Sequence, residues 1–212
     1  MKIFRASLVL TAFILFVGRV LFAASAEGKK DLLPLGSSAP DFHLPDVVSG
    51  KEYSLNDFKS HKALLVIVLC RHCPYVQHVK EGIAVLAKDY ADKDIAFVAL
   101  SANDAAAYKE DGPESLKGMA LEAGFTFPLL YDESQQVTKA LTAVATPDFF
   151  LFDAGRKLIY RGQFDSSRPG SEGPVTGRDV RAAIDAVLSD QPVSPHQKPS
   201  VGCSIKWKKT NA

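Results

Sequence analysis

Residues 63–74 read ALLVIVLCRHCP, and the fold class follows from this stretch. Its first seven side chains are all apolar and three are β-branched, which is typical of a central strand buried on both faces. Cys70-Arg71-His72-Cys73 follows directly. Apolar side chains then recur at spacings of three and four residues, which predicts an amphipathic helix: Val76, Val79, Ile83, Leu86 and Tyr90. We therefore expect the two cysteines at a strand-to-helix junction.

The rest of the chain alternates between strand and helix patterns. Residues 40–44 and 50–55 have alternating side chains and predict a hairpin. Beyond residue 90 the pattern predicts strands at 95–100 and 127–131, helices at 113–122 and 133–144, a hairpin of 148–152 with 157–164, and a last helix at 176–188. This order predicts an α/β fold with a mixed central sheet flanked by helices and an N-terminal hairpin extension.

The first 26 residues differ in composition from the rest. Residues 1–5 carry two positive charges, residues 6–18 carry none, and Ala24-Ser25-Ala26 supplies small residues at a cleavage site. These features predict a secretory signal peptide, residues 1–26, and an exported protein that is periplasmic or secreted. Arg19 interrupts the apolar run, which argues against a stable membrane helix, and an uncleaved N-terminal anchor is the alternative.

Composition and charge limit the classes of function that the chain can have. The 212 residues are 47% hydrophobic and 23% charged, as in ordinary globular proteins. Removing residues 1–26 takes away three basic and no acidic residues, which changes the formal charge from +1 to −2. A chain this close to neutral has no overall electrostatic field that would attract nucleic acid or a membrane surface. Residues 27–38 read as a polar entry segment, 39–190 as the folded domain, and 191–212 as a Pro-rich tail.

The Cys-x-x-Cys spacing points to thiol chemistry. A cysteine at the start of a helix lies beside unpaired N–H groups and the positive end of the helix dipole, which stabilise a thiolate. On this basis we predict that Cys70 is the nucleophile and that Cys73 resolves a mixed disulfide formed on it. Arg71 and His72 between them would favour the thiolate and make the pair more oxidising.

Three other interpretations of the pair fit less well. A structural zinc site needs two more ligands at zinc spacing, and only Cys203 and scattered histidines are available. A c-type haem needs histidine after the second cysteine, where Pro74 stands. A structural disulfide across two residues would constrain little chain entropy. We therefore expect redox function, with neither a metal nor a cofactor.

Three motifs carry a family resemblance. HCPYV stands at residues 72–76, TPDFFLFD at 146–153 and GCSIKWK at 202–208. With the strand before the cysteines, the chain resembles the thioredoxin fold, and its hairpin and its insertion between Ser101 and Phe127 make it similar to the redoxin branch. That branch includes peroxiredoxins and exported TlpA-like oxidoreductases, and the three motifs resemble a peroxiredoxin-like Cys-x-x-Cys family.

The resemblance implies a site and a reaction. It implies that Thr146 and a cis-Pro147 face the cysteines and bind an extended substrate through backbone groups. It also implies thiol-disulfide exchange with protein dithiols or disulfides, and a second redox protein that donates or accepts electrons. Two thioredoxin features are absent, because Leu69 replaces the tryptophan before the first cysteine and Leu64 replaces the buried acid.

Two alternatives remain open. Peroxiredoxins carry P-x-x-x-T-x-x-C, and counting back from either cysteine does not give that pattern, yet a thiol peroxidase could use the same pair. Sco-type redoxins bind copper with Cys-x-x-x-Cys-Pro and a distant histidine. Here the cysteine spacing is one residue shorter, and the distant histidine would be His196.

The tail carries the third cysteine and the only tryptophan. Ile205 and Trp207 alternate with polar residues, so we predict that they point inward and that the tail docks as an edge strand or extended cover. Cys203 would then be buried, or would lie near the active-site cysteines as a third, resolving thiol. The alternative is a frayed terminus.

Overall fold

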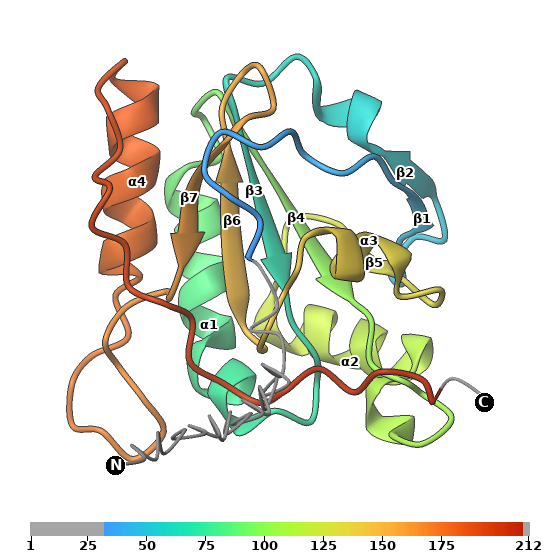
Figure 1. Cartoon of the computed structure of the whole chain (residues 1–212). Helices are drawn as coiled ribbons and strands as arrows, with labels where there is room; N and C mark the ends of the chain where they lie inside the picture. The colour runs from blue at the N-terminus through green and yellow to red at the C-terminus, as the bar shows by residue number, and fades with distance from the viewer. Residues whose placement is uncertain (1–31, 210–212) are drawn as a thin grey trace, which may run out of the picture. The chain divides into compact units, whose positions relative to one another are not determined.

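A five-stranded mixed sheet forms the centre of the protein (Figure 1). The computed structural model describes residues 32–209, so the predicted signal peptide lies outside the described residues. The strand order is β5-β4-β3-β6-β7, where β3 pairs in parallel with β4 and antiparallel with β6. The strands are β3 (Ala63–Val68), β4 (Ile95–Ser101), β5 (Leu129–Tyr131), β6 (Asp148–Phe152) and β7 (Leu158–Gly162). The sequence predicted this α/β arrangement.

Strand β3 is central and completely buried, as its continuous apolar pattern predicts. Successive side chains point to opposite faces of a sheet, so this strand contributes to two cores. Leu65 and Ile67 pack in the core under α1 (Pro74–Asp89), α2 (Pro113–Ala123) and α4 (Arg178–Leu188). Leu64 and Val66 pack in the core on the opposite face.

The second face of the sheet is covered by short elements. The predicted N-terminal hairpin is present as β1 (His43–Pro45) paired with β2 (Glu52–Ser54), followed by the 3-10 helix Leu55–Phe58. Side chains of this hairpin, of α3 (Gln136–Ala140) and of the C-terminal tail pack on this core. The tail is therefore part of the folded domain.

Both strands of the N-terminal hairpin, strand β5 and helix α4 are shorter than their sequence patterns predict, and two further elements end early for reasons visible in the structure. The helix expected at 133–144 is confined to α3, because Gln135 and Thr142 have left-handed φ values of 63° and 53° at its two ends. The strand expected at 157–164 ends at Gly162, because the backbone then turns so that the Phe164 carbonyl accepts the Asp179 N–H at 3.2 Å. Both endings depend on contacts outside the local pattern.

The tail is fixed by hydrogen bonds along its length. The Gln163 N–H donates to the Lys198 carbonyl at 3.1 Å, and the Lys206 N–H donates to Asn103 Oδ1 at 2.8 Å. Ile205 is buried and Trp207 packs on the same core, as predicted. Figure 1 shows the tail crossing the end of the sheet at which β3 leads into α1.

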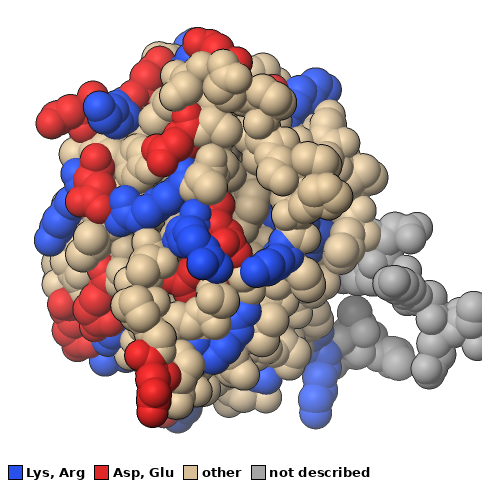
Figure 2. All heavy atoms as spheres, turned by 90° about the vertical axis from the view of Figure 1, so that its left-hand side faces the viewer, with Lys and Arg blue, Asp and Glu red and all other residues tan. Residues whose placement is uncertain are grey.

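Charged side chains of both signs are interspersed on the face that carries α4 (Figure 2). No single sign dominates that view, in agreement with the near-zero formal charge of the sequence. Within residues 32–209, no helix is both long enough and apolar enough to cross a bilayer.

The docked tail predicts that Ile205→Ala destabilises the domain by about 2 kcal/mol or more, because a buried side chain is truncated. Val201→Ala is the matched control in the same tail, since Val201 is 43% exposed and should change stability by less than about 0.5 kcal/mol. Urea unfolding of the reduced protein measures both. Equal effects of the two substitutions would contradict the docking.

Candidate active site

The two motif cysteines lie where β3 passes into α1, as predicted. Leu69 continues the strand, since its N–H donates to the Leu100 carbonyl at 2.9 Å. Cys70 follows at the end of the strand, and α1 begins at Pro74 with Cys73 as its N-cap residue. Both cysteines are fully buried. The helix N-terminus is therefore next to Cys73, whereas the sequence analysis placed it next to Cys70.

Thr146 connects both sulfur atoms to the sheet. The peptide bond between Thr146 and Pro147 is cis, and Pro147 directly precedes β6. Cys70 Sγ lies 3.3 Å from Thr146 Oγ1, and Cys73 Sγ lies 3.1 Å from the Thr146 carbonyl oxygen. The structure thus brings together the four residues that the sequence singled out for catalysis and substrate binding.

A hydrogen bond between the two thiols shifts their pKa values in opposite directions. The pKa of Cys73 is lowered to about 4, chiefly by a hydrogen bond from Cys70, with smaller contributions from Cys203, Thr146 and the Val76 N–H in the first turn of α1. The pKa of Cys70 is raised, first by that same hydrogen bond, and then by burial and by the nearby Asp111 charge. The sequence predicted a low pKa for Cys70, and here the hydrogen bond between the two thiols lowers the pKa of Cys73 instead.

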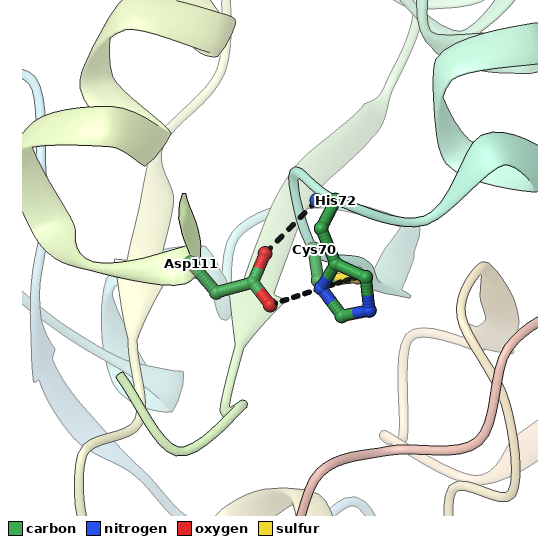
Figure 3. A group of neighbouring side chains, drawn as sticks. All are labelled: Cys70, His72 and Asp111. Atoms are coloured by element: carbon green, nitrogen blue, oxygen red, sulfur yellow. Dashed lines mark hydrogen bonds and ion pairs between the residues drawn. The ribbon is translucent and has the colours of Figure 1, made fainter. Parts of the chain in front are cut away.

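A buried carboxylate holds the loop between the cysteines (Figure 3). Asp111 Oδ1 accepts the N–H groups of Arg71 at 2.8 Å and His72 at 3.1 Å. Its Oδ2 accepts the Asn103 amide at 2.8 Å and bonds to His72 Nδ1. His72 Nδ1 also lies 3.9 Å from Cys70 Sγ, so Asp111 fixes the ring beside that sulfur.

Arg71 points away from the sulfur atoms. Its guanidinium donates to the Ser115 carbonyl at 2.7 Å and pairs with Glu122 on α2 at 3.3 Å. Of the two residues predicted to tune the pair, His72 lies beside Cys70 and Arg71 attaches the loop to α2.

Asp111 and Asn103 were missed in the sequence analysis. They lie 39 and 31 residues from His72, in a stretch that reads as polar and helix-poor. Polar residues in such a stretch are usually solvated, and no local pattern marks these two as buried. The sequence alone does not show that the turn before α2 folds back onto the loop between the two cysteines.

One cluster has the donor types of a metal site. Ligand atoms of Cys70, His72 and Asp111 all lie within 4.8 Å of one another. His72 Nδ1 is already hydrogen-bonded to Asp111, so a cation would have to replace that bond. His196, the distant ligand of the copper hypothesis, lines a different cavity with Tyr160 and Asp179.

Cys203 approaches the pair on the docked tail. Its backbone pairs with that of Thr146, and its side chain packs against the core cluster that contains Cys70 and Cys73. Burial, followed by a hydrogen bond with Cys73, raises the pKa of Cys203 to about 11. The sequence predicted that Cys203 would be buried or would lie near the active-site cysteines, and in the structure it lies near them.

The chain is similar to several known proteins. The family model described as Redoxin matches residues 34–177. A solved structure of an uncharacterized conserved protein from Geobacillus kaustophilus is 50% identical, with a TM-score of 0.82, over 85% of this chain and 95% of that one. The thiol-disulfide oxidoreductase ResA from Geobacillus thermodenitrificans is 26% identical over 61% of this chain and 70% of its own length.

A third comparison identifies the fold. The thioredoxin domain of a thiol-disulfide oxidoreductase from Bacteroides vulgatus is 21% identical and superposes with a TM-score of 0.54. The match covers 70% of this chain and 96% of that domain. The fold is therefore thioredoxin-like, as the resemblance implied.

The lowered pKa of Cys73 predicts a thiolate in the reduced protein at neutral pH. Because the pKa in the folded state is depressed, the thiolate persists on acidification and is lost as the pH falls through about 4. Its ultraviolet absorbance measures this titration. Cys70→Ala removes the main hydrogen-bond donor and should move the midpoint upward, whereas Cys73→Ala should abolish the acidic transition.

Limited alkylation near pH 6 followed by peptide mapping checks which sulfur is ionised. We expect Cys73 to react first, and preferential labelling of Cys70 would restore the assignment made from the sequence.

Proposed function

Because this chain belongs to the redoxin family, we propose that it acts as an exported thiol-disulfide oxidoreductase with Cys70 and Cys73 as its redox pair. One observation carries the proposal. Two buried sulfurs lie at the start of α1 beside Thr146, and a hydrogen bond between them lowers the pKa of Cys73 and raises that of Cys70. The predicted signal peptide at 1–26 supports export.

The proposed reaction is a two-step exchange. The Cys73 thiolate attacks one sulfur of a partner disulfide, forms a mixed disulfide and releases one partner thiolate. Cys70 then loses its proton and attacks Cys73, which forms the Cys70–Cys73 disulfide and releases the second partner thiolate. Two electrons pass to the partner, and a second redox protein restores the dithiol. The reverse sequence oxidises a partner dithiol.

These roles reverse the sequence-based assignment, in which Cys70 attacks and Cys73 resolves. The hydrogen bond from Cys70 is the main group that favours charge on Cys73, with a smaller contribution from the Val76 N–H, while burial and the Asp111 carboxylate disfavour charge on Cys70. A thiolate is the attacking species in exchange, so we assign the first attack to Cys73.

The surroundings of the pair support substrate binding and proton transfer. The Thr146 N–H and carbonyl pair with the Cys203 backbone of the docked tail, and an extended substrate that replaced this segment would make the same bonds, which is the role proposed for the Thr146-Pro147 loop. We assign His72 a tuning role: when protonated, its ring favours the Cys70 thiolate that forms during resolution. Arg71 tunes the pair indirectly by attaching the loop to α2.

His72→Ala should make the pair more reducing. The substitution removes the imidazole that lies 3.9 Å from Cys70 Sγ and leaves the Asp111 carboxylate near that sulfur, so negative charge on the reduced pair is less stabilised. We expect the potential to become more negative by on the order of 30 mV, about a tenfold change in the exchange constant. Equilibration with a glutathione buffer measures it. An unchanged potential would show that the helix terminus tunes the pair without the imidazole.

Disulfide exchange and peroxide reduction are separable. We expect the reduced protein to reduce a model protein disulfide far faster than it consumes hydrogen peroxide. Arg161 on β7 is the arginine that a peroxidase reaction could use to contact peroxide. Its guanidinium donates to Thr142 and Asp148 and lies over the Phe150 ring, so it is engaged in structure. Peroxide turnover near roughly 10⁷ M⁻¹s⁻¹ would replace this proposal with a thiol peroxidase. Stoichiometric copper retention by the reduced protein, without exchange activity, would replace it with a metal carrier.

A further inference from the structure

The C-terminal tail pairs with the backbone group that we assign to substrate. The Thr146 N–H donates to the Cys203 carbonyl at 2.9 Å, and the Cys203 N–H donates to the Thr146 carbonyl at 3.2 Å. These two bonds form an antiparallel bridge between residues 146 and 203. A peptide bound in extended form at a sheet edge makes the same pair of bonds. The tail therefore lies as a bound peptide would.

The approach of the tail to this loop is unusually close. A Cβ atom at position 202 would lie 1.9 Å from the Thr146 carbonyl oxygen and 2.7 Å from its carbonyl carbon. Only glycine fits there without a backbone shift. Gly202 thus allows the next residue, Cys203, to reach the Thr146 peptide.

The register of the tail is fixed on both sides of Cys203. On one side, Ser200 Oγ donates to Asp148 Oδ1 at 2.6 Å and lies 2.7 Å from the Gly162 carbonyl. On the other side, the Lys206 carbonyl accepts the Asp104 N–H at 2.8 Å. With both flanks bonded, the tail cannot slide by one residue, and the Cys203 side chain stays on the side of the redox pair.

Thr146 links the three thiols. Its carbonyl lies 3.1 Å from Cys73 Sγ and also accepts the Cys203 N–H, and its hydroxyl lies 3.3 Å from Cys70 Sγ. Cys203 is partly exposed, whereas the other two cysteines are buried. A thiol held at this place faces both the pair and the solvent.

We propose that the tail is an internal substrate of the redox pair and that Cys203 is a third redox thiol, which forms a disulfide with Cys73. This inference rests on the proposed function. Starting from the Cys70–Cys73 disulfide, the Cys203 thiol loses its proton and its sulfur attacks Cys73. The Cys70–Cys73 bond breaks, the Cys73–Cys203 bond forms, and Cys70 takes up the proton. One disulfide exists before and after, so the step needs no external oxidant.

In the resulting Cys73–Cys203 disulfide, Cys203 is the sulfur that partner proteins reach. A partner thiolate attacks the Cys203 sulfur, and Cys73 leaves as the thiolate of lowered pKa, which is the faster leaving group. The second partner thiol then attacks the mixed disulfide on Cys203 and releases it. The partner becomes a disulfide, and the two electrons stay on the three-thiol site.

The test uses the full chain with Cys70→Ser, in which the pair cannot close. After treatment with oxidised glutathione, non-reducing digestion and mass spectrometry should show a Cys73–Cys203 disulfide within one chain as the main product. The matched control adds Cys203→Ser and Ser204→Cys, which moves the thiol to the exposed neighbouring position. We expect the control to form the link to Cys73 at least tenfold more slowly.

Two outcomes would overturn the inference. Equal rates for the two positions would mean that a loose tail brings any thiol to Cys73, and links between chains instead of within one would mean that Cys203 has another partner. A separate variant, Cys203→Ser with Cys70 and Cys73 intact, tests the proposed function by itself. If the Cys70–Cys73 disulfide forms there and exchanges with a model protein, only the inference on the tail has failed.

Discussion

Thr146 is the residue on which the redox pair, the sheet and the tail depend. Its side chain contacts Cys70, its carbonyl contacts Cys73, and both of its backbone groups pair with Cys203. The loop is held in place because β6 begins two residues later, with Asp148 paired to Val68 of β3. Any displacement of this peptide would change the surroundings of both sulfurs and undock the tail at once.

The second constraint is the buried charge of Asp111. A carboxylate without solvent requires donors, and four groups supply them: two backbone N–H groups of the cysteine loop, the His72 ring and the Asn103 amide. These bonds fix the loop, but they also put a negative charge near Cys70. That charge adds to the hydrogen bond between the thiols and to burial in raising the pKa of Cys70. The same carboxylate thus supports the site geometrically and divides the roles of the thiols.

Local patterns predicted the parts of this protein that local physics decides. The apolar run before Cys70 and the stripe from Val76 to Tyr90 are buried as expected, because period and burial determine strand and helix there. The helix at 133–144 was overestimated, since two left-handed residues limit it. The place of Asp111 in the site could not be predicted, because it comes from a segment about 40 residues away that meets the cysteine loop only in the fold. The order of the two cysteine pKa values depends on how the two side chains are oriented toward each other, which the spacing alone does not give.

Access to the buried pair has two physical routes, and they differ in what must break. Displacing the tail would break the bonds of Cys203 to Thr146, of Ser200 to Asp148 and of Lys206 to Asn103, and would expose Ile205. Exchange through the partly exposed Cys203 breaks none of these, because the sulfur that meets the partner already lies on the docked chain. A thiol carried by the covering segment therefore lets a closed site exchange electrons while its packing stays intact.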